Sequence, residues 1–148
     1  MAVEINLENK VALVTGGTRG IGKAIVNELL QSGAKVYATG TNLMDLTILN
    51  SENKNPLLTY LQLDLSVTNN VKKFISETLK LTEIDILVNN AGINIVSDAD
   101  IISDEEFLRI QKINVHGPFL LAQAFGKQML IKNWGRIINI SSIWGVVT

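Results

Sequence analysis

The chain of 148 residues has no cysteine, which excludes a disulfide framework and thiolate chemistry. Its one histidine, His116, has no nearby serine or cysteine nucleophile with a third orienting group in the local sequence, which disfavours it as a general base. We also expect no metal site. No apolar run reaches membrane-spanning length, and the first residues lack the basic and apolar regions of a signal peptide. These absences predict a cytoplasmic protein without a membrane partner.

Charge is scarce as well. Charged residues make up 18% of the chain, the formal net charge is −1, and the lysines and arginines are scattered. No basic cluster suggests nucleic-acid binding, and we expect no such partner. Apolar residues, in contrast, reach 47%, and a chain of this length can bury one core. We therefore expect a single domain over residues 1–148.

Apolar runs alternate with helical patterns along the whole chain. We predict strands at 11–14, 35–39, 57–63, 85–88 and 136–140. A helix is marked by Val67, Val71, Phe74, Ile75 and Leu79, and a short one could be lined by Leu43, Leu46 and Leu49. Repeated β-α units with buried strands predict an α/β fold, a doubly wound parallel sheet with about five strands. In such sheets, ligands bind at the carboxyl ends of the strands.

Residues 15–22 read Thr-Gly-Gly-Thr-Arg-Gly-Ile-Gly and follow the first predicted strand. Gly16 can take a positive φ in the turn, Gly20 lets the backbone approach a pyrophosphate, and Gly22 lets the next helix pack closely on its strand. The free N–H groups and the dipole of that helix attract an anion. We therefore predict a phosphate-binding turn. The helix should form one apolar face and end at a left-handed glycine; these residues are Ile21, Ala24, Ile25, Leu29 and Gly33.

Two more motifs follow predicted strands. Asn89-Asn90-Ala91-Gly92 follows the fourth strand, and Ile140-Ser141-Ser142 follows the fifth. All three motifs therefore fall at the sheet edge where ligands bind. Between the last two strands, Ser103-Asp104-Glu105-Glu106 is a capping box that predicts the start of a long helical segment reaching Met129. We expect this segment to be bent near Gly117-Pro118.

In their order and spacing, these motifs resemble the short-chain dehydrogenase/reductase family. The resemblance also includes Asp64 after the third strand and Lys-Ile-Asn at 112–114. It implies a Rossmann-like NAD(P)-binding domain and an oxidoreductase that reduces a ketone to an alcohol by hydride transfer. Within the family, the overall sequence pattern is most similar to 3-oxoacyl-(acyl carrier protein) reductases. Related alcohol, steroid and sugar dehydrogenases, however, share every motif.

The resemblance implies roles for individual residues. Ser142 would hydrogen-bond the substrate carbonyl, and Asn114 would anchor a water of the proton relay where the long helix is distorted. The pyrophosphate and adenosine ribose would be held by Gly16, Thr18, Arg19, Gly20, Ile21 and Gly22. The adenine would be held by Asp64 and Leu65, and the nucleotide near its ribose by Asn89, Ala91 and Gly92.

Simpler interpretations stay open for several of these residues. Asp64 and Ser66 could cap the next helix, and Asn114 could satisfy backbone groups at the predicted bend. Ser141-Ser142 could be a plain exit from a strand. The apolar residues of the long helix fit either a core-facing surface or the paired-helix interface of the family's homodimers and homotetramers; they are Phe119, Leu120, Phe125 and Met129.

Cofactor choice depends on the end of the second strand. An acidic residue there holds the ribose 2′-OH of NAD, whereas NADP needs positive charge or small residues that admit the 2′-phosphate. The chain has Gly40-Thr41-Asn42 at this point, no carboxylate before Asp45, and Arg19 in the glycine turn. These residues favour NADP(H) over NAD(H). The arginine that commonly follows this strand and helps to bind NADP is replaced by Thr41, so NAD(H) stays open as the alternative cofactor.

The sequence also departs from the family in its catalytic motif. Family members carry Tyr-x-x-x-Lys after the serine, but here the only tyrosines, Tyr37 and Tyr60, are followed four residues on by Thr41 and Asp64. We therefore expect a domain that is incomplete at its C-terminus, an inactive 148-residue chain, and an enzyme only when the protein is length-complete. The alternative is a non-catalytic nucleotide-binding or interaction module.

The expected partners follow from the same reading. They are a small-molecule or acyl-carrier-bound carbonyl substrate, further copies in a homodimer or homotetramer, and, as an alternative, a second chain that supplies the remaining half. An incomplete sheet would leave the fifth strand as an edge with Ile137, Ile138 and Ile140 short of cover.

Overall fold

The structure is a computed structural model that describes residues 5–98 and 100–143. Its sheet contains β1 (Val11–Val14), β2 (Lys35–Gly40), β3 (Leu58–Gln62), β4 (Ile86–Asn89) and β5 (Arg136–Asn139). The helices are α1 (Gly20–Gln31), α2 (Leu43–Glu52), α3 (Thr68–Leu81), α4 (Asp104–Gln111), the π-helical η1 (Lys112–His116) and α5 (Gly117–Ile131). The predicted alternation of strands and helices is therefore confirmed, with element ends displaced by one or two residues.

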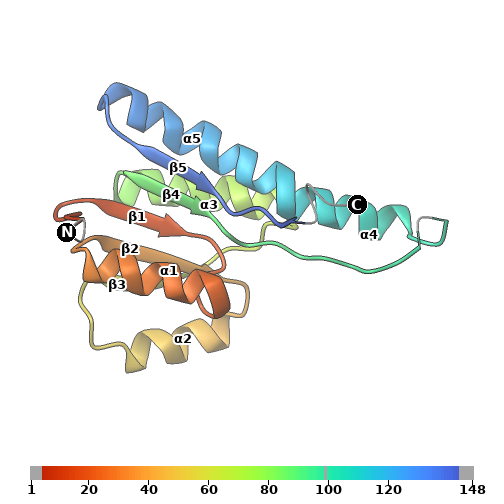
Figure 1. Ribbon diagram of the computed structural model, residues 1–148, viewed down its shortest axis with the longest axis horizontal. Helices are drawn as coiled ribbons and strands as arrows, with labels where there is room; N and C mark the ends of the chain where they lie inside the picture. Colours follow the sequence, from red (N-terminus) through yellow and green to blue (C-terminus); the bar gives the residue numbers. More distant parts are fainter. Residues whose placement is uncertain (1–4, 99, 144–148) are drawn as a thin grey trace.

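The five strands form one sheet in the order β3-β2-β1-β4-β5, and every neighbouring pair is parallel. Helix α1 covers one face of the sheet, and α3 and α5 cover the other (Figure 1). This arrangement confirms the predicted doubly wound, Rossmann-like sheet. The chain reverses its direction of travel across the sheet between β3 and β4, which places β1 and β4 side by side at the switch point.

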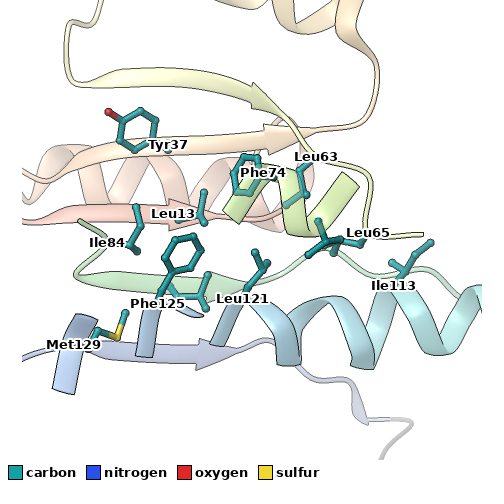
Figure 2. Close-up of a cluster of buried hydrophobic side chains, with 12 residues drawn as sticks. Leu13, Tyr37, Leu63, Leu65, Phe74, Ile84, Ile113, Leu121, Phe125 and Met129 are labelled. Carbon is teal, nitrogen blue, oxygen red and sulfur yellow. The ribbon is translucent and has the colours of Figure 1, made fainter. Parts of the chain in front are cut away.

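Alternation of side chains along the buried strands builds a core on each face. Leu13 of β1 points to the α3 and α5 side, where it joins Phe74 and the fully buried Phe125 (Figure 2). Ala12 and Val14 point to the other side and join Val26 of α1. Because both faces are covered, the central strands contain almost only apolar residues, as parallel strands usually do.

The predicted apolar face of α1 is partly wrong. Ile25 and Leu29 are half-buried as expected, but Ile21 is 66% exposed, and the fully buried positions are Gly22 and Val26. Ile21 lies in the first turn of the helix, beyond the end of the strands that α1 covers, and lines a cleft there. Gly33 has φ +89° directly after the C-cap residue, as predicted.

The long helical segment is irregular rather than simply bent at Gly117-Pro118. The capping box is present, with Ser103 Oγ accepting from Glu106 N at 3.2 Å and Ser103 N donating to the Glu106 carboxylate. The irregularity is the π-helical turn η1, which immediately precedes Gly117. Pro118 has no N–H to donate to the carbonyl of Asn114, four residues earlier, so an ordinary α-helical bond cannot form there.

The core-facing interpretation of the apolar residues in this segment is confirmed for only part of α5. Phe125 and Met129 are in the core, whereas Phe119 is 56% exposed. The segment α4 and the loop before it extend past the carboxyl ends of the strands (Figure 1). None of the helices in the described ranges is long and apolar enough to cross a membrane.

The strand β5 lies at the edge of the sheet and pairs only with β4 within the described residues. All four of its residues are exposed, and Ile137 and Ile138 are 41% and 46% accessible. Ile140, just after the strand, is 40% accessible. The sequence-based expectation of a poorly covered apolar edge is thus confirmed for this part of the chain.

Candidate functional site

A cleft of about 680 Å³ opens at the carboxyl ends of β1, β2, β3 and β4. Eleven of the fourteen residues proposed from sequence as catalytic or cofactor-binding line it: Gly16, Thr18, Arg19, Gly20, Ile21, Gly22, Thr41, Asp64, Leu65, Ala91 and Gly92. They come from four separate β-α connections. The tertiary structure therefore gathers them into one site that accommodates an extended ligand.

The glycine turn between β1 and α1 forms one wall of the cleft. Gly16 and Gly20 have φ of +64° and +54°, a region that residues with a side chain rarely adopt. A Cβ on Gly22 would collide with the Gly16 carbonyl oxygen and would stand 2.5 Å from Asn90 Nδ2. Gly22 is thus required for close contact with the turn and with Asn90, rather than with the strand as the sequence suggested.

The N-terminus of α1 suits an anion. Its N-cap residue is Arg19, no side chain caps the first turn, and that turn contains no acidic residue. The N–H groups of the first turn of a helix have no intrahelical partner, and the helix dipole adds partial positive charge. A Cβ added to the adjacent Gly20 would meet no atom within 4 Å, so the backbone there borders open space. This geometry fits the phosphate groups of a dinucleotide.

The residue Thr15 ties this turn to the segment after β4. Its buried hydroxyl accepts hydrogen bonds from the backbone N–H groups of Asn90 and Ala91, each at 3.0 Å. In return, the Asn90 side-chain amide donates to the carbonyl oxygens of Thr15 at 2.9 Å and Gly16 at 3.2 Å. Two walls of the cleft are therefore fixed to each other by a polar network at the switch point of the sheet.

A third wall is the turn between β2 and α2. Asn42 is the N-cap of α2, and its Oδ1 accepts from Met44 N at 2.9 Å and from Asp45 N at 3.4 Å. The Thr41 carbonyl accepts from Gln62 Nε2 at 3.0 Å. Asp45 lies in the first turn of α2 and also lines the cleft. The predicted short helix is confirmed, and it places a carboxylate at this wall.

The carboxylate of Asp64 holds the turn that follows β3. Its Oδ1 accepts from Ser66 N at 2.8 Å and from Ser66 Oγ at 2.6 Å. The N-cap of α3 is Val67, which has no side chain able to cap, so Asp64 is not a helix cap. Asp64 instead shapes the turn that it forms with Ser66, ahead of the helix. Its neighbour Leu65 belongs to the buried core.

The side chain of Asn114 lies beside the cleft without lining it. Its Oδ1 accepts from Ile93 N at 2.9 Å, and its Nδ2 donates to Ile93 O at 2.8 Å. A Cβ on Gly92 would stand 3.5 Å from Asn114 Oδ1. The amide therefore binds the loop after β4 and does not satisfy backbone groups at Gly117-Pro118, which was the alternative that the sequence left open.

Two other sequence candidates do not line the cleft. Asn89 is buried, and its Nδ2 donates to Asn139 Oδ1 at 2.9 Å across the β4–β5 pair, whereas Asn89 Oδ1 has no partner within the described residues. Ser142 lies three residues past the end of β5 and is exposed. Ile140 N donates to Asn89 O at 2.9 Å, so the chain just past β5 still lies beside the end of β4 as it approaches Ser142.

Several polar residues that line the cleft were given no site role from the sequence, among them Asn90, Asp45 and Arg109. Asn90 stood inside a quoted motif, but only the structure shows that its side chain, and not that of Asn89, reaches the glycine turn. Arg109 precedes the buried Ile113 by four residues, so one face of the helix presents both to the cleft. The charged residues of the cleft are two of each sign, Arg19, Arg109, Asp45 and Asp64.

Neither tyrosine lines the cleft. Tyr37 is buried in the core beside α3 and α5 (Figure 2), and Tyr60 is on the edge strand β3, where burial raises the pKa of its phenol. His116 is exposed in η1. Across residues 5–98 and 100–143, no group of three or more histidine, aspartate or glutamate side chains could hold a metal ion.

The parallel sheet, the glycine turn and the uncapped helix at its edge define a Rossmann-like domain of the kind that binds nucleotides. The sequence model of the family described as "short chain dehydrogenase" matches residues 10–148. The chain belongs to this family.

Relatives of known or assigned activity differ from one another in substrate. The chain is 39% identical over 155 residues to "3-oxoacyl-[acyl-carrier-protein] reductase FabG" of Aquifex aeolicus (strain VF5), covering 97% of this chain and 59% of that protein. It is 32% identical to "NAD-dependent glycerol dehydrogenase" of Listeria innocua, covering 97% of this chain and 57% of that protein. It therefore spans little more than half the length of these relatives.

Solved structures give the same fold. A metagenomic short-chain oxidoreductase in complex with NADP superimposes with a TM-score of 0.84 and 32% identity, over 94% of this chain and 64% of that one.

Proposed function

We propose that this chain is the nucleotide-binding part of an NADP(H)-dependent oxidoreductase that reduces a ketone to an alcohol. The observation that carries the proposal is the cleft at the switch point of the sheet, where the uncapped N-terminus of α1 meets the turn that Thr15 and Asn90 hold in place. Such a site binds the diphosphate of a dinucleotide. When bound, the nicotinamide supplies the hydride.

The cofactor would lie along the cleft with its diphosphate at Gly16, Gly20 and the N–H groups of α1. The adenosine would extend toward Thr41, Asp64 and Leu65, and the second nucleotide toward Ala91 and Gly92. Asn89 is buried against Asn139, so its contribution would be to hold the end of β4 in place. Arg19 is the cation of the glycine turn and would bind the 2′-phosphate, which favours NADP(H).

The chemistry would use Ser142 and Asn114. Ser142 would donate a hydrogen bond to the substrate carbonyl and so polarise it. The side-chain amide of Asn114 is already bound to Ile93, so a relay water would have to be held by the backbone carbonyl of Asn114. Pro118, four residues later, has no N–H that could donate to this carbonyl. The proton donor itself, the tyrosine of the family's Tyr-x-x-x-Lys motif, would belong to sequence outside these 148 residues.

We favour a 3-oxoacyl group on an acyl carrier as the substrate class because the Aquifex aeolicus relative bears that name and is 39% identical. Sugar and glycerol substrates stand as alternatives, since relatives with those names are also similar. A non-catalytic nucleotide-binding module remains a second candidate function, supported by the lack of any tyrosine at the cleft in the described residues. A cytoplasmic homodimer or homotetramer is part of the proposal for the enzyme.

The proposal is tested in the full-length protein with purified variants. Reduction of a 3-oxoacyl thioester should consume NADPH, and Ser142→Ala should lower turnover by about 10²-fold or more while NADPH binding stays nearly unchanged. Arg19→Ala should weaken NADPH binding by about 1–3 kcal/mol and leave NADH binding nearly unchanged. Binding of NADPH without reduction of any ketone would favour the non-catalytic module, and equal losses for both cofactors would remove the 2′-phosphate role of Arg19.

A further inference from the structure

The carboxylate of Asp45 stands at the wall of the cleft where the cofactors NADP and NAD would differ. Asp45 is at the third position of α2, lines the cleft together with Thr41 and Asn42, and is exposed. Within the described residues its carboxylate takes part in no ion pair or hydrogen bond. Its negative charge is therefore not neutralised by a partner and acts on whatever enters this part of the cleft.

The N–H groups of α2 offer an anion little compensation. Asn42 Oδ1 already accepts from Met44 N and Asp45 N, and the Asn42 carbonyl accepts from Leu46 N at 3.1 Å. A phosphate at this helix would have to displace the Asn42 side chain or use the single N–H of Leu43. The favourable charge for a phosphate thus comes from Arg19, on the neighbouring connection between β1 and α1.

From these contacts we infer that Asp45 is a specificity-determining residue that opposes Arg19 and weakens binding of the 2′-phosphate, so that the cleft discriminates only modestly between NADP(H) and NAD(H). This inference rests on the proposed nucleotide-binding function and adds to it a residue that acts against the favoured cofactor. A phosphate monoester carries nearly two negative charges at neutral pH, whereas the ribose 2′-OH carries none. Repulsion by a carboxylate therefore affects one cofactor and spares the other.

The inference is tested with Asp45→Asn in the full-length protein. The amide keeps the size of the side chain and removes its charge. The probes are adenosine 2′,5′-bisphosphate and adenosine 5′-monophosphate, which differ only in the 2′-phosphate and report on this part of the cleft without any hydride transfer. At low salt, Asp45→Asn should tighten the bisphosphate by about three- to tenfold and change the monophosphate by less than about twofold.

The matched control is Glu52→Gln, which removes one carboxylate from the other end of the same helix, outside the cleft. It changes net charge equally and should leave the ratio of the two affinities unchanged. Raising the salt from about 0.01 M to about 0.15 M shortens the Debye length from about 30 Å to about 8 Å and should shrink the effect of Asp45→Asn. A purely structural effect of the substitution would not depend on salt in this way.

The possible outcomes separate the two proposals. If neither probe binds to the unmodified protein, the nucleotide-binding function fails. If both bind and Asp45→Asn changes their affinity ratio no more than Glu52→Gln does, the function stands and the role of Asp45 is wrong.

Discussion

Asn114 binds both backbone groups of Ile93, with Oδ1 accepting from the N–H at 2.9 Å and Nδ2 donating to the carbonyl at 2.8 Å. The two residues are on segments that meet only in the folded protein: Asn114 in the π-helical turn η1 and Ile93 in the loop after β4. A side-chain amide holds an N–H donor and a carbonyl acceptor side by side, and so can pair with both groups of a backbone residue as a neighbouring strand would. This contact sets the position of the loop beside Gly92 and the cleft.

Replacing Asn114 tests this contact. Asn114→Ala should lower the free energy of unfolding by about 0.5–1.5 kcal/mol, because the Ile93 groups are near the surface and water can replace the lost partner. It should also speed hydrogen exchange at the Ile93 amide. Asn114→Asp keeps the acceptor and should preserve that protection. Equal exchange at Ile93 in all three proteins would show that the contact does not hold the loop.

The crowding at Gly22 predicts opposite effects for two helical glycines. Gly22→Ala forces a methyl group against the Gly16 carbonyl and Asn90, and should destabilise the protein by about 1–3 kcal/mol and weaken cofactor binding. Gly126→Ala in α5 places its methyl 3.7 Å from Ile137 Cδ1, an ordinary contact, and should stabilise the protein by up to about 1 kcal/mol through helix propensity. Urea denaturation of both variants provides the comparison, and similar effects of the two substitutions would refute the crowding argument.

The ion pair at the opposite end of the sheet predicts a dependence of stability on pH. Lys132 Nζ lies 2.5 Å from Asp85 Oδ1, and the hydrogen bond to Asp85, helped by Glu83, raises the pKa of the lysine above its ordinary 10.5. The carboxylate of Asp85 is buried and also accepts from Val11 N at 2.9 Å. Stabilisation by Lys132 should therefore be complete below the unfolded-state pKa and should be lost as the pH rises through the higher folded-state value.

Substitution of Lys132 measures this effect. Lys132→Met should cost about 1–3 kcal/mol at about pH 8 because Asp85 loses its charged partner, and the difference from the unmodified protein should already be smaller at about pH 11, above the ordinary pKa of lysine. The control is Lys73→Met, which breaks the exposed Lys73–Glu77 pair and should cost no more than about 0.5 kcal/mol. A loss of stability for Lys132→Met that is the same at both pH values would contradict the linkage.

The outer edge of β5, which no strand covers within residues 5–98 and 100–143, predicts a partner strand. Arg136 N and Ile140 N donate to carbonyls at the two ends of β4, so in a parallel pair the N–H groups of Ile137 and Asn139 point away from β4. We predict that a further polypeptide segment, from a longer chain or from another chain, covers this edge and its exposed isoleucines. In the full-length protein the amides of Ile137 and Asn139 should then exchange as slowly as that of Ile140. Exchange at those two amides at the rate of an open peptide would show that the edge is free.

Much of the fold was predictable because the signals are local. Apolar runs such as 11–14 and 85–88 reveal buried strands, and the glycine turn and the Ser103 capping box reveal helix starts through rules that involve only neighbouring residues. Ile21 was predicted to be buried because the periodicity of a helix does not show where the sheet beneath it ends. Similarly, the bend expected from Gly117-Pro118 is a π-helical turn, since proline shows that a hydrogen bond is lost but not how the helix rearranges.

The sequence by itself determined which turns of this protein could bind a phosphate and which residues would face one edge of the sheet, because glycine φ preferences, strand length and parallel topology act locally or through general rules. Only the tertiary structure decided that Asn90 reaches the glycine turn while Asn89 pairs with Asn139, that Asn114 binds Ile93, and that Asp45 shares a cleft with Arg19. These relationships join residues that are 21 to 75 positions apart. Their geometry depends on how the layers pack, which no local pattern encodes.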